Sequence, residues 1–582
     1  MKFSIVTLFI GTAAASLGSS RIFEQLDSAP EPWLLKDDTR ANQDMSFKLR
    51  IHLKNRNLDE LKKRIIKSST PDDPSYGGHL SREEVNSMIA PSGDAFVRVR
   101  DWLESYNLSS QATFENDWVL VDSTIGEIET LLDTKYHVFE NTETGRKTAR
   151  TLAYSLPAAL HAYVDIVAPT IVFGGNTKPE LSTFVKETET PKNLKALRST
   201  GSSQNSACNG TNTIDCLKTL YKFKNFRPSR HNGNEIAVAH FVEQYFRYSD
   251  LATFYSKYAP DAAVAFKEVL INGGLNPQNT TIDNLTAANM DTQLVGGLTY
   301  PTPSTYFSTG GRAPVRNGEQ AENEPFLEFL TYLLAMEKIP QTISIGYADK
   351  EWTVPPSYAH TVCDLFAQVT ARGVTILFPS GDSGSGRNCS VINPNKLSYT
   401  PLFPASCPWV TTVGGTQAVG PEEASFTSGG GFSNYFPRPS WQDAAVSSWL
   451  STKADPAFTQ YYNTSGRAYP DVSAQGVKVP GIYLGEELIN GGGGAATATF
   501  ASVVALLNSD RISNGLPPFG FLNPWLYSVG KSGLNDILSG TSGGCKEIPG
   551  SGFTAVAGWD PITGLGTPDF EKLRLASTGL SS

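Results

Sequence analysis

Short apolar runs that alternate with helical patterns constrain the fold of this 582-residue chain more than any other feature. The segments 236–241, 342–345 and 374–378 have the composition of buried strands, and the segments 326–336 and 358–371 carry one apolar helical face. Buried strands separated by helices are typical of a parallel sheet that helices cover on both faces. We therefore expect an α/β domain, with any ligand site beyond the carboxyl ends of its strands.

A different pattern occupies the first third of the chain. Strict alternation of apolar and polar residues over 46–54 predicts a half-buried strand, and Ser81 with Glu84 forms an S-x-x-E capping box that begins a helix. A hairpin is expected near Gly145. The order of elements, β-α-α-β-α-β, predicts a small α+β domain of ferredoxin-like kind.

Composition sets the expected domain boundaries. Residues 1–20 have the order of a secretory signal peptide, with a lysine, a short apolar run and then small residues. Residues 21–175 then form the α+β domain. Residues 176–206, rich in Thr, Ser, Lys and Asn, have the composition of an exposed linker, and residues 207–582 form the α/β domain.

Charge and the length of the apolar segments argue against two classes of partner, nucleic acids and membranes. With 48 basic against 57 acidic side chains the net charge is −9, and no basic block offers contacts to phosphate, so nucleic-acid binding is not expected. The N-terminal apolar run is too short to span a membrane and no later segment reaches the necessary length of about 20 residues. We expect a secreted protein.

Cysteines and sequons fit an extracellular protein. All six cysteines lie beyond residue 200, and an even number in an oxidising compartment predicts three disulfides. Cys208 with Cys216 is the candidate for a local loop, and the sequence leaves the other pairings open. Six N-x-S/T sequons begin at Asn107, Asn209, Asn279, Asn284, Asn388 and Asn463.

Candidate catalytic residues follow from the expected sheet. Asp382 comes directly after the strand 374–378 and is therefore expected at the carboxyl edge. Ser383 in G-D-S-G and Ser542 in G-T-S-G-G resemble serine-hydrolase motifs. The first motif belongs to a fold of antiparallel barrels and the second lacks its strand and helix, so neither serine is expected to be a nucleophile.

Two further segments are unusual. Asp291 lies on a predicted helix, but Ala287 occupies the position one turn earlier, where a paired-carboxylate site needs a second acid. A single helical Asp of this kind ordinarily lies on a solvated face. Four glycines, 491–494, enter an Ala/Val/Leu-rich helix, which gives a flexible loop with exposed N–H groups at a helix N-terminus.

These segments belong to a set of collinear motifs that resembles one family. The motifs are SGDSGSG (380–386), FPASCPWVTTVGGT (403–416), SGGGFSNYFPRPSWQ (428–442), YPDVSAQG (469–476), TFASVVALLN (499–508), PPFGFLNPWLY (517–527) and AGWDPITGLGTPDF (557–570). Together they resemble the sedolisins, secreted serine-carboxyl peptidases, and most closely the fungal tripeptidyl-peptidase type. YGGHLSREEV (76–85) resembles the activation propeptide of the same family.

The resemblance implies a subtilisin-like catalytic fold behind a ferredoxin-like propeptide, a Ser-Glu-Asp triad and an Asp in the oxyanion hole. In this chain the Asp of the triad corresponds to Asp291 and the oxyanion Asp to Asp382, whereas the Glu position is Ala287 and the Ser position is Gly494. Thr497 is the nearest hydroxyl but lies about one helical turn from the required position. Nucleophile and general base are therefore both absent.

The resemblance also implies one calcium ion. Its ligands would be the carboxylates of Asp536 and Asp560 with the main-chain carbonyls of Ile537, Val556 and Gly558. Such an oxygen-only set suits a hard cation. The family usually has Gly where Val556 stands, but a carbonyl ligand does not depend on the side chain.

The preferred interpretation is a secreted, calcium-stabilised sedolisin homologue of impaired or absent catalytic activity, which keeps its own propeptide and binds a peptide or protein. One alternative is an active acid peptidase, either a tripeptidyl-peptidase or an endopeptidase. Another is a peptide-binding or regulatory protein. A hydrolase that uses Asp291 and Asp382 as an acid/base pair is the remaining hypothesis.

Overall fold

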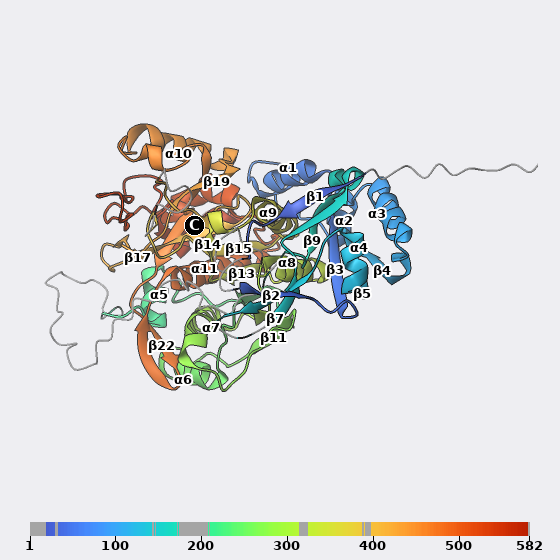
Figure 1. The fold of residues 1–582 in the computed structure, drawn as a ribbon. Coiled ribbons are helices and arrows are strands. Elements are labelled where there is room, and N and C mark those ends of the chain that lie inside the picture. The colour runs from blue at the N-terminus through green and yellow to red at the C-terminus, as the bar shows by residue number, and fades with distance from the viewer. Residues whose placement is uncertain are drawn as a thin grey trace, which may run out of the picture.

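The computed structural model describes residues 19–29, 33–142, 145, 147–171, 173, 208, 210–313, 324–386, 389 and 397–579. Residues 1–18 of the predicted signal peptide and the whole predicted linker lie outside the described residues. The chain forms an N-terminal domain, blue to cyan in Figure 1, packed against a larger C-terminal domain.

The N-terminal domain is built on a four-stranded antiparallel sheet in the order β4-β5-β3-β9. Its strands are β3 (Ser46–Leu53), β4 (Ala112–Glu115), β5 (Trp118–Thr124) and β9 (Val164–Ala168), and its helices are α1 (Leu58–Ser69), α2 (Arg82–Ile89), α3 (Gly93–Ser105) and α4 (Ile125–Leu131). Two smaller sheets complete it, formed by β1 (Ser20–Gln25) with β8 (Ala153–Pro157), and by β2 (Trp33–Arg40) with β6 (His137–Asn141) and β7 (Lys147–Arg150).

Local sequence signals predict this domain well. Strand β3 coincides with the alternating segment, and its apolar residues are buried. The capping box is confirmed, because the Ser81 hydroxyl accepts from the Glu84 N–H while the Glu84 carboxylate accepts from the Ser81 N–H. The hairpin around Gly145 is the β6–β7 pair. The domain is thus α+β, as predicted.

The C-terminal domain contains an eight-stranded sheet in the order β11-β12-β10-β13-β15-β17-β18, with β21 paired to β17. All these pairs are parallel except β17–β18. The strands are β10 (Ile236–His240), β11 (Phe266–Ile271), β12 (Ser304–Thr309), β13 (Thr342–Ile345), β15 (Thr375–Pro379), β17 (Thr411–Gln417), β18 (Glu423–Ala424) and β21 (Val472–Gln475).

Helices surround this sheet, and short two-stranded ladders lie at its margins. The helices are α5 (Ile214–Leu220), α6 (Tyr248–Tyr258), α7 (Thr286–Thr299), α8 (Phe326–Ala335), α9 (Pro356–Ala371), α10 (Ser440–Thr452), α11 (Gly493–Ser513), α12 (Asn523–Tyr527) and α13 (Phe570–Thr578). The ladders pair β14 (Asp349–Lys350) with β16 (Leu402–Phe403), β19 (Gly431–Pro437) with β20 (Gly466–Tyr469), β22 (Val479–Tyr483) with β23 (Glu486–Asn490), and β24 (Leu534–Asn535) with β25 (Thr567–Pro568).

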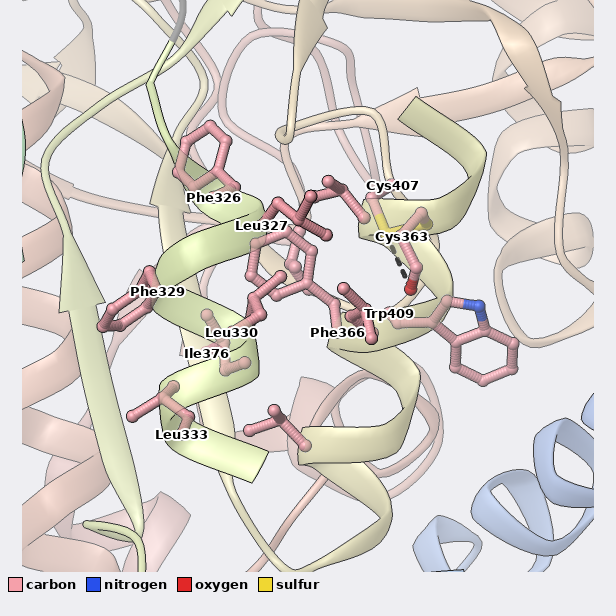
Figure 2. Packing of buried hydrophobic residues seen from close by; sticks show 14 of the residues in the cluster. Phe326, Leu327, Phe329, Leu330, Leu333, Cys363, Phe366, Ile376, Cys407 and Trp409 are labelled. Atoms are coloured by element: carbon pink, nitrogen blue, oxygen red, sulfur yellow. Dashed lines mark hydrogen bonds between the residues drawn. A yellow bond between two sulfur atoms is a disulfide. The ribbon is translucent and has the colours of Figure 1, made fainter. Parts of the chain in front are cut away.

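Helices cover the sheet on both faces, as the sequence predicts. Along β10, Ala237 and Ala239 belong to the hydrophobic core that contains α8 and α9, whereas Ile236 and Val238 belong to the core that contains α7 and α11. Side chains of a strand alternate between its two faces, so the two cores lie on opposite sides of the sheet. Figure 2 shows the first core, where Leu327 and Leu330 of α8 lie toward Phe366 of α9 and Phe329 points away from it.

Three disulfides cross-link the C-terminal domain, and they account for all six cysteines. The pairs are Cys208–Cys216, Cys363–Cys407 and Cys389–Cys545. The predicted number and the local pair are therefore confirmed. Within the described part of the chain, none of the helices combines the length and the apolar character that crossing a bilayer requires.

A buried histidine joins two carboxylates in the N-terminal domain. His52 on β3 is 1% exposed, with Nε2 3.1 Å from Asp117 Oδ2 and Nδ1 3.4 Å from Asp165 Oδ2. Burial by itself would lower the pKa of His52, but the hydrogen bonds and charges of the two aspartates outweigh burial and raise this pKa to about 9.

Replacing His52 by Gln is expected to remove a pH-dependent part of this domain's stability. A histidine whose pKa is raised on folding stabilises the fold fully below its unfolded pKa, and this contribution is lost as the pH rises through about 9. The difference corresponds to about 3 kcal/mol. Melting curves of the full chain should therefore differ most between the variant and the unmodified protein near pH ~6 and converge near pH ~10. His161→Gln, in the same domain, should keep the original profile, and an unchanged profile for His52→Gln would contradict the assignment.

Candidate functional site

The candidate site lies at the carboxyl edge of the parallel sheet. Strand β10 ends at His240, β13 is followed by Gly346, and β15 leads into the loop that carries Asp382. Helices α7 and α11 pack beside each other on one face, where Ala288 and Ala495 share a hydrophobic core. The sheet thus brings the predicted positions on α7, on α11 and in the 380–386 loop to one end of the domain.

Asp382 follows β15 at the carboxyl edge of the sheet, as predicted, and there it lies against the glycine loop. Its Oδ1 accepts a hydrogen bond of 2.8 Å from the Gly493 N–H, the first residue of α11. A Cβ on Gly492 would be 3.1 Å from Asp382 Oδ2, and the Gly492 φ of +130° also favours glycine. A carboxylate at a helix N-terminus is stabilised by the exposed N–H groups and the helix dipole.

The position predicted for the nucleophile carries no hydroxyl. Gly494 lies in the first turn of α11 and is buried. Thr497, one turn further on, is also fully buried, and its hydroxyl donates to the Gly493 carbonyl at 2.7 Å. Because that hydroxyl is committed to the backbone of its own helix, it is not directed at a substrate carbonyl.

The position predicted for the general base carries no acid. Ala287 is buried on α7, and its N–H donates to Gln244 Oε1 at 3.2 Å. Asp291, one turn later, does not lie on a solvated face, contrary to the expectation for an isolated helical Asp, because α7 is buried along nearly its whole length.

Asp291 is paired instead with a histidine. His240 Nε2 lies 3.2 Å from Asp291 Oδ2, and both side chains are at most 1% exposed. Burial raises the pKa of Asp291, and the nearby His240 opposes this rise. A Cβ on Gly346 would be 2.7 Å from Asp291 Oδ2, so the pocket around this carboxylate is closely packed.

Sequence analysis did not identify His240. The feature that could have identified His240 is its place as a polar residue at the carboxyl end of the apolar strand β10, in the segment Ile-Ala-Val-Ala-His. Nothing in the sequence pairs it with Asp291, which lies 51 positions later. The described residues show no hydrogen bond between Asp291 and Asp382, so the two retained carboxylates contact different partners.

The two serine motifs that resemble hydrolase signatures pack against each other. The Ser385 N–H donates to the Gly543 carbonyl at 3.0 Å, and a Cβ on Gly384 would be only 2.0 Å from that oxygen. The Ser542 hydroxyl accepts from the Phe553 N–H at 2.9 Å. This close approach of the two backbones explains Gly384, and the Cys389–Cys545 disulfide links the two segments nearby.

The two segments that carry the predicted calcium ligands contact each other. The Gly558 N–H donates to Asp536 Oδ2 at 2.8 Å, which brings the two segments together. Asp560 is fully buried, and its carboxylate accepts from the N–H groups of Val556, Ile562 and Thr563. Carboxylate oxygens suit a hard cation, but in this structure both carboxylates accept main-chain N–H groups, so the calcium site stays a prediction.

Comparisons with known proteins cover both domains. Residues 35–173 match the family model described as Pro-kumamolisin, activation domain. The chain is 36% identical over 596 aligned residues to a probable tripeptidyl-peptidase SED2 of Arthroderma benhamiae, with 98% of this chain and 99% of the relative covered. It is 37% identical over 593 residues to tripeptidyl-peptidase SED2 of Arthroderma otae, with 98% of each covered. Among solved structures, Pseudomonas sedolisin complexed with two molecules of pseudo-iodotyrostatin matches with a TM-score of 0.47 and 22% identity, over 62% of this chain and 97% of that chain.

Proposed function

Because this chain belongs to the sedolisin family of peptidases, we propose that it is a family member in which peptide-bond hydrolysis is severely impaired. The observation that carries the proposal is the glycine at position 494, in the first turn of α11 and one residue after the Gly493 N–H that binds Asp382. Acyl transfer needs a nucleophile at this point and a base to take its proton. Ala287 cannot supply the base.

The expected decrease in kcat supports a severe impairment of hydrolysis and not a modest one. Catalytic triads act as units, and removal of the nucleophile alone costs about 10⁶-fold in kcat in a well-studied serine peptidase. The Thr497 hydroxyl is bonded to the helix backbone, and a misplacement of even ~1 Å costs about 100-fold. The retained Asp382 can stabilise charge only after a nucleophile has attacked.

A hydrolysis assay on the full chain tests the proposal. The purified protein is incubated at acidic pH with a fluorogenic peptide of the tripeptidyl-peptidase type, next to an active peptidase that cleaves the same substrate. We expect no turnover above that of an Asp382→Ala variant, and mass spectrometry should show the N-terminal domain still covalently attached. Robust turnover that Asp382→Ala abolishes would contradict the proposal and favour an active acid peptidase.

Peptide binding without hydrolysis is the second candidate function. The carboxylate of Asp382 keeps its place at the N-terminus of α11, at the edge of the sheet where α/β folds bind ligands. Fluorescence anisotropy with labelled peptides should then show saturable binding that Asp382→Ala weakens. Absence of binding across a peptide library of mixed sequence would exclude this function.

We also propose that the C-terminal domain binds one calcium ion through Asp536 and Asp560. Chelation with EGTA is expected to lower the Tm of the full chain by several degrees, because an ion at 100 times its Kd stabilises a fold by about 2.7 kcal/mol. Calcium should restore the Tm and an equal concentration of magnesium should not. The exposed Asp536 gives the matched variant, since Asp536→Asn should show no response to EGTA. An unmodified protein whose Tm ignores EGTA would exclude the site.

Secretion and glycosylation complete the proposal. The residue order of 1–20 and three disulfides favour an oxidising, extracellular location. Asn107 and Asn279 have exposed side chains, whereas Asn209 and Asn388 lie outside the described residues. Peptide mapping of protein secreted by a eukaryotic host should find glycans on Asn107 and Asn279, and bare asparagines at both positions would contradict this expectation.

A further inference from the structure

The segment 76–80, between α1 and α2 of the N-terminal domain, is inserted into the C-terminal domain. His79 Nε2 donates a hydrogen bond of 2.7 Å to the Pro518 carbonyl, and the Leu80 N–H donates to the Ala371 carbonyl at 2.9 Å. Both acceptors belong to the C-terminal domain. The motif that resembles a propeptide signature is therefore a contact between the two domains.

Glycines shape the slot that receives the His79 ring. A Cβ on Gly373 would be 2.9 Å from the ring, and a Cβ on Gly520 would be 2.5 Å from it. Both distances are shorter than real side chains tolerate, and both glycines have positive φ values, +84° and +67°. Gly77 shows the reverse fit, because its Cβ would be 2.3 Å from the Pro517 ring. Thus each domain has glycines at the points where the other domain approaches it most closely.

The slot lies at the end of the sheet opposite the candidate site. Gly373 comes just before β15, whereas Asp382 follows the same strand. The Thr375 hydroxyl at the start of β15 donates to the Gly520 carbonyl, which fixes the slot to the sheet. The contacts in the slot are therefore separate from the positions predicted to be catalytic.

The two charged groups that act most strongly on His79 are arginines, and the acidic side chains of Glu83 and Glu337 line the adjoining pocket together with Gly373 and Pro518. On the C-terminal side, the Arg511 guanidinium is buried and lies 5.5 Å from the centre of the Tyr76 ring. On the N-terminal side, Arg64 of α1 donates to the Gly78 carbonyl at 3.2 Å. Burial first, and then these two arginines, lower the pKa of His79, while the bond to Pro518 opposes them.

Apolar side chains continue the interface beyond the slot. Leu61 and Ile65 of α1, Val85 of α2 and Trp118 of β5 share one hydrophobic core with α8 and α9 of the C-terminal domain. Trp102, in contrast, belongs to the core inside the N-terminal domain. The two tryptophans therefore report separately on docking of the domains and on folding of the N-terminal domain.

We propose that residues 76–80 are the anchor that holds the N-terminal domain on the C-terminal domain, with His79 in the glycine slot as its central contact. The anchor goes beyond the proposed loss of hydrolysis and is independent of it. In the uncleaved chain, this anchor keeps the N-terminal domain packed on the C-terminal domain.

Hydroxyl-radical footprinting of the full chain tests the anchor. His79→Ala is expected to raise oxidation of Trp118 by at least about threefold and to leave Trp102, which is fully buried in its own domain, unchanged. Gly520→Ala fills the slot from the other side and should reproduce this effect. His231→Ala, an exposed histidine in the C-terminal domain, is the control and should change neither tryptophan.

The outcomes separate docking from folding. Unchanged Trp118 oxidation in both His79→Ala and Gly520→Ala overturns the proposal. If Trp102 oxidation also rises in His79→Ala, the Gly520→Ala variant decides, since it leaves the sequence of the N-terminal domain intact. Neither result depends on whether the protein hydrolyses peptides.

Footprinting at decreasing pH is the second part of the test. Protonation would place a third positive charge next to Arg64 and Arg511, so docking is stabilised above the ordinary histidine pKa of about 6.5 and weakens as the pH falls below it. Between about pH 7 and pH 5, Trp118 oxidation should rise in the unmodified protein and stay flat in His79→Gln, which keeps a hydrogen-bond donor without the titrating ring. Identical pH profiles for the two proteins would overturn the role of His79.

Discussion

The double variant Ala287→Glu, Gly494→Ser is expected to hydrolyse peptides at acidic pH at least about 100-fold faster than the unmodified chain. The serine would stand in the first turn of α11, beside the Gly493 N–H that already binds Asp382. The glutamate would stand one turn from Asp291 on the same face of α7. Nucleophile, base and oxyanion group would then be present together.

The expected gain is large but incomplete. Loss of a nucleophile costs about 10⁶-fold, whereas a misplacement of ~1 Å costs about 100-fold, so an imperfectly placed pair should still recover part of the rate. His240 holds Asp291 at 3.2 Å, which leaves this carboxylate less free to orient a new glutamate. Release of a fluorophore from a tripeptide substrate measures the rate.

Single variants are the matched controls for this experiment. Gly494→Ser and Ala287→Glu, each alone, should stay near the background, because each lacks one partner of the proton transfer. Addition of Asp382→Ala to the double variant should remove most of the recovered rate. A double variant that folds with an unchanged Tm but remains inactive would show that these two positions do not account for the proposed loss of hydrolysis.

Replacing Asp471 by Ala is expected to destabilise the C-terminal domain by about 3–5 kcal/mol. Asp471 precedes β21, and its Oδ2 lies 2.6 Å from Arg467 Nη2, with both side chains 0% exposed. The same carboxylate accepts from the Thr412 N–H at 2.8 Å and from the Tyr527 hydroxyl at 3.0 Å. Its removal leaves a buried guanidinium without its counterion, and this uncompensated charge causes most of the cost.

Urea unfolding of the full chain measures this effect. The exposed pair Arg438–Asp443 provides the control, since its separation is 2.8 Å but the Asp443 side chain is 58% exposed. Asp443→Ala should therefore cost less than about 1 kcal/mol. An Asp471→Ala variant as stable as Asp443→Ala would contradict the assignment of Arg467–Asp471 as a buried, stabilising contact.

Elements with a local signal were predicted accurately from the sequence. Strand β3 follows from alternation, helix α2 begins at its capping box, and the Cys208–Cys216 loop closes over eight positions. Each of these features depends on residues that are close in the chain, where spacing determines geometry.

Elements held by distant partners were not predicted. The sheet also contains β11, β12, β17 and β21, which were not predicted from the sequence. These short segments form strands only because they pair with neighbours that are distant in the chain. The same holds for the slot of His79, because Pro518 lies 439 positions after it. Spacing carries no information about such contacts.

The sequence by itself determined which side chains stand at the two positions predicted for the nucleophile and the base. Gly494 and Ala287 have no hydroxyl and no carboxylate in any conformation, so the absence of the two groups needs no structure to establish. Only the tertiary structure decided what the retained groups do. Asp382 binds the N–H of Gly493, which lies 111 positions away, and Asp291 pairs with His240. Partners of this kind meet because parallel strands end at one edge of the sheet and buried polar groups must find hydrogen-bond partners there.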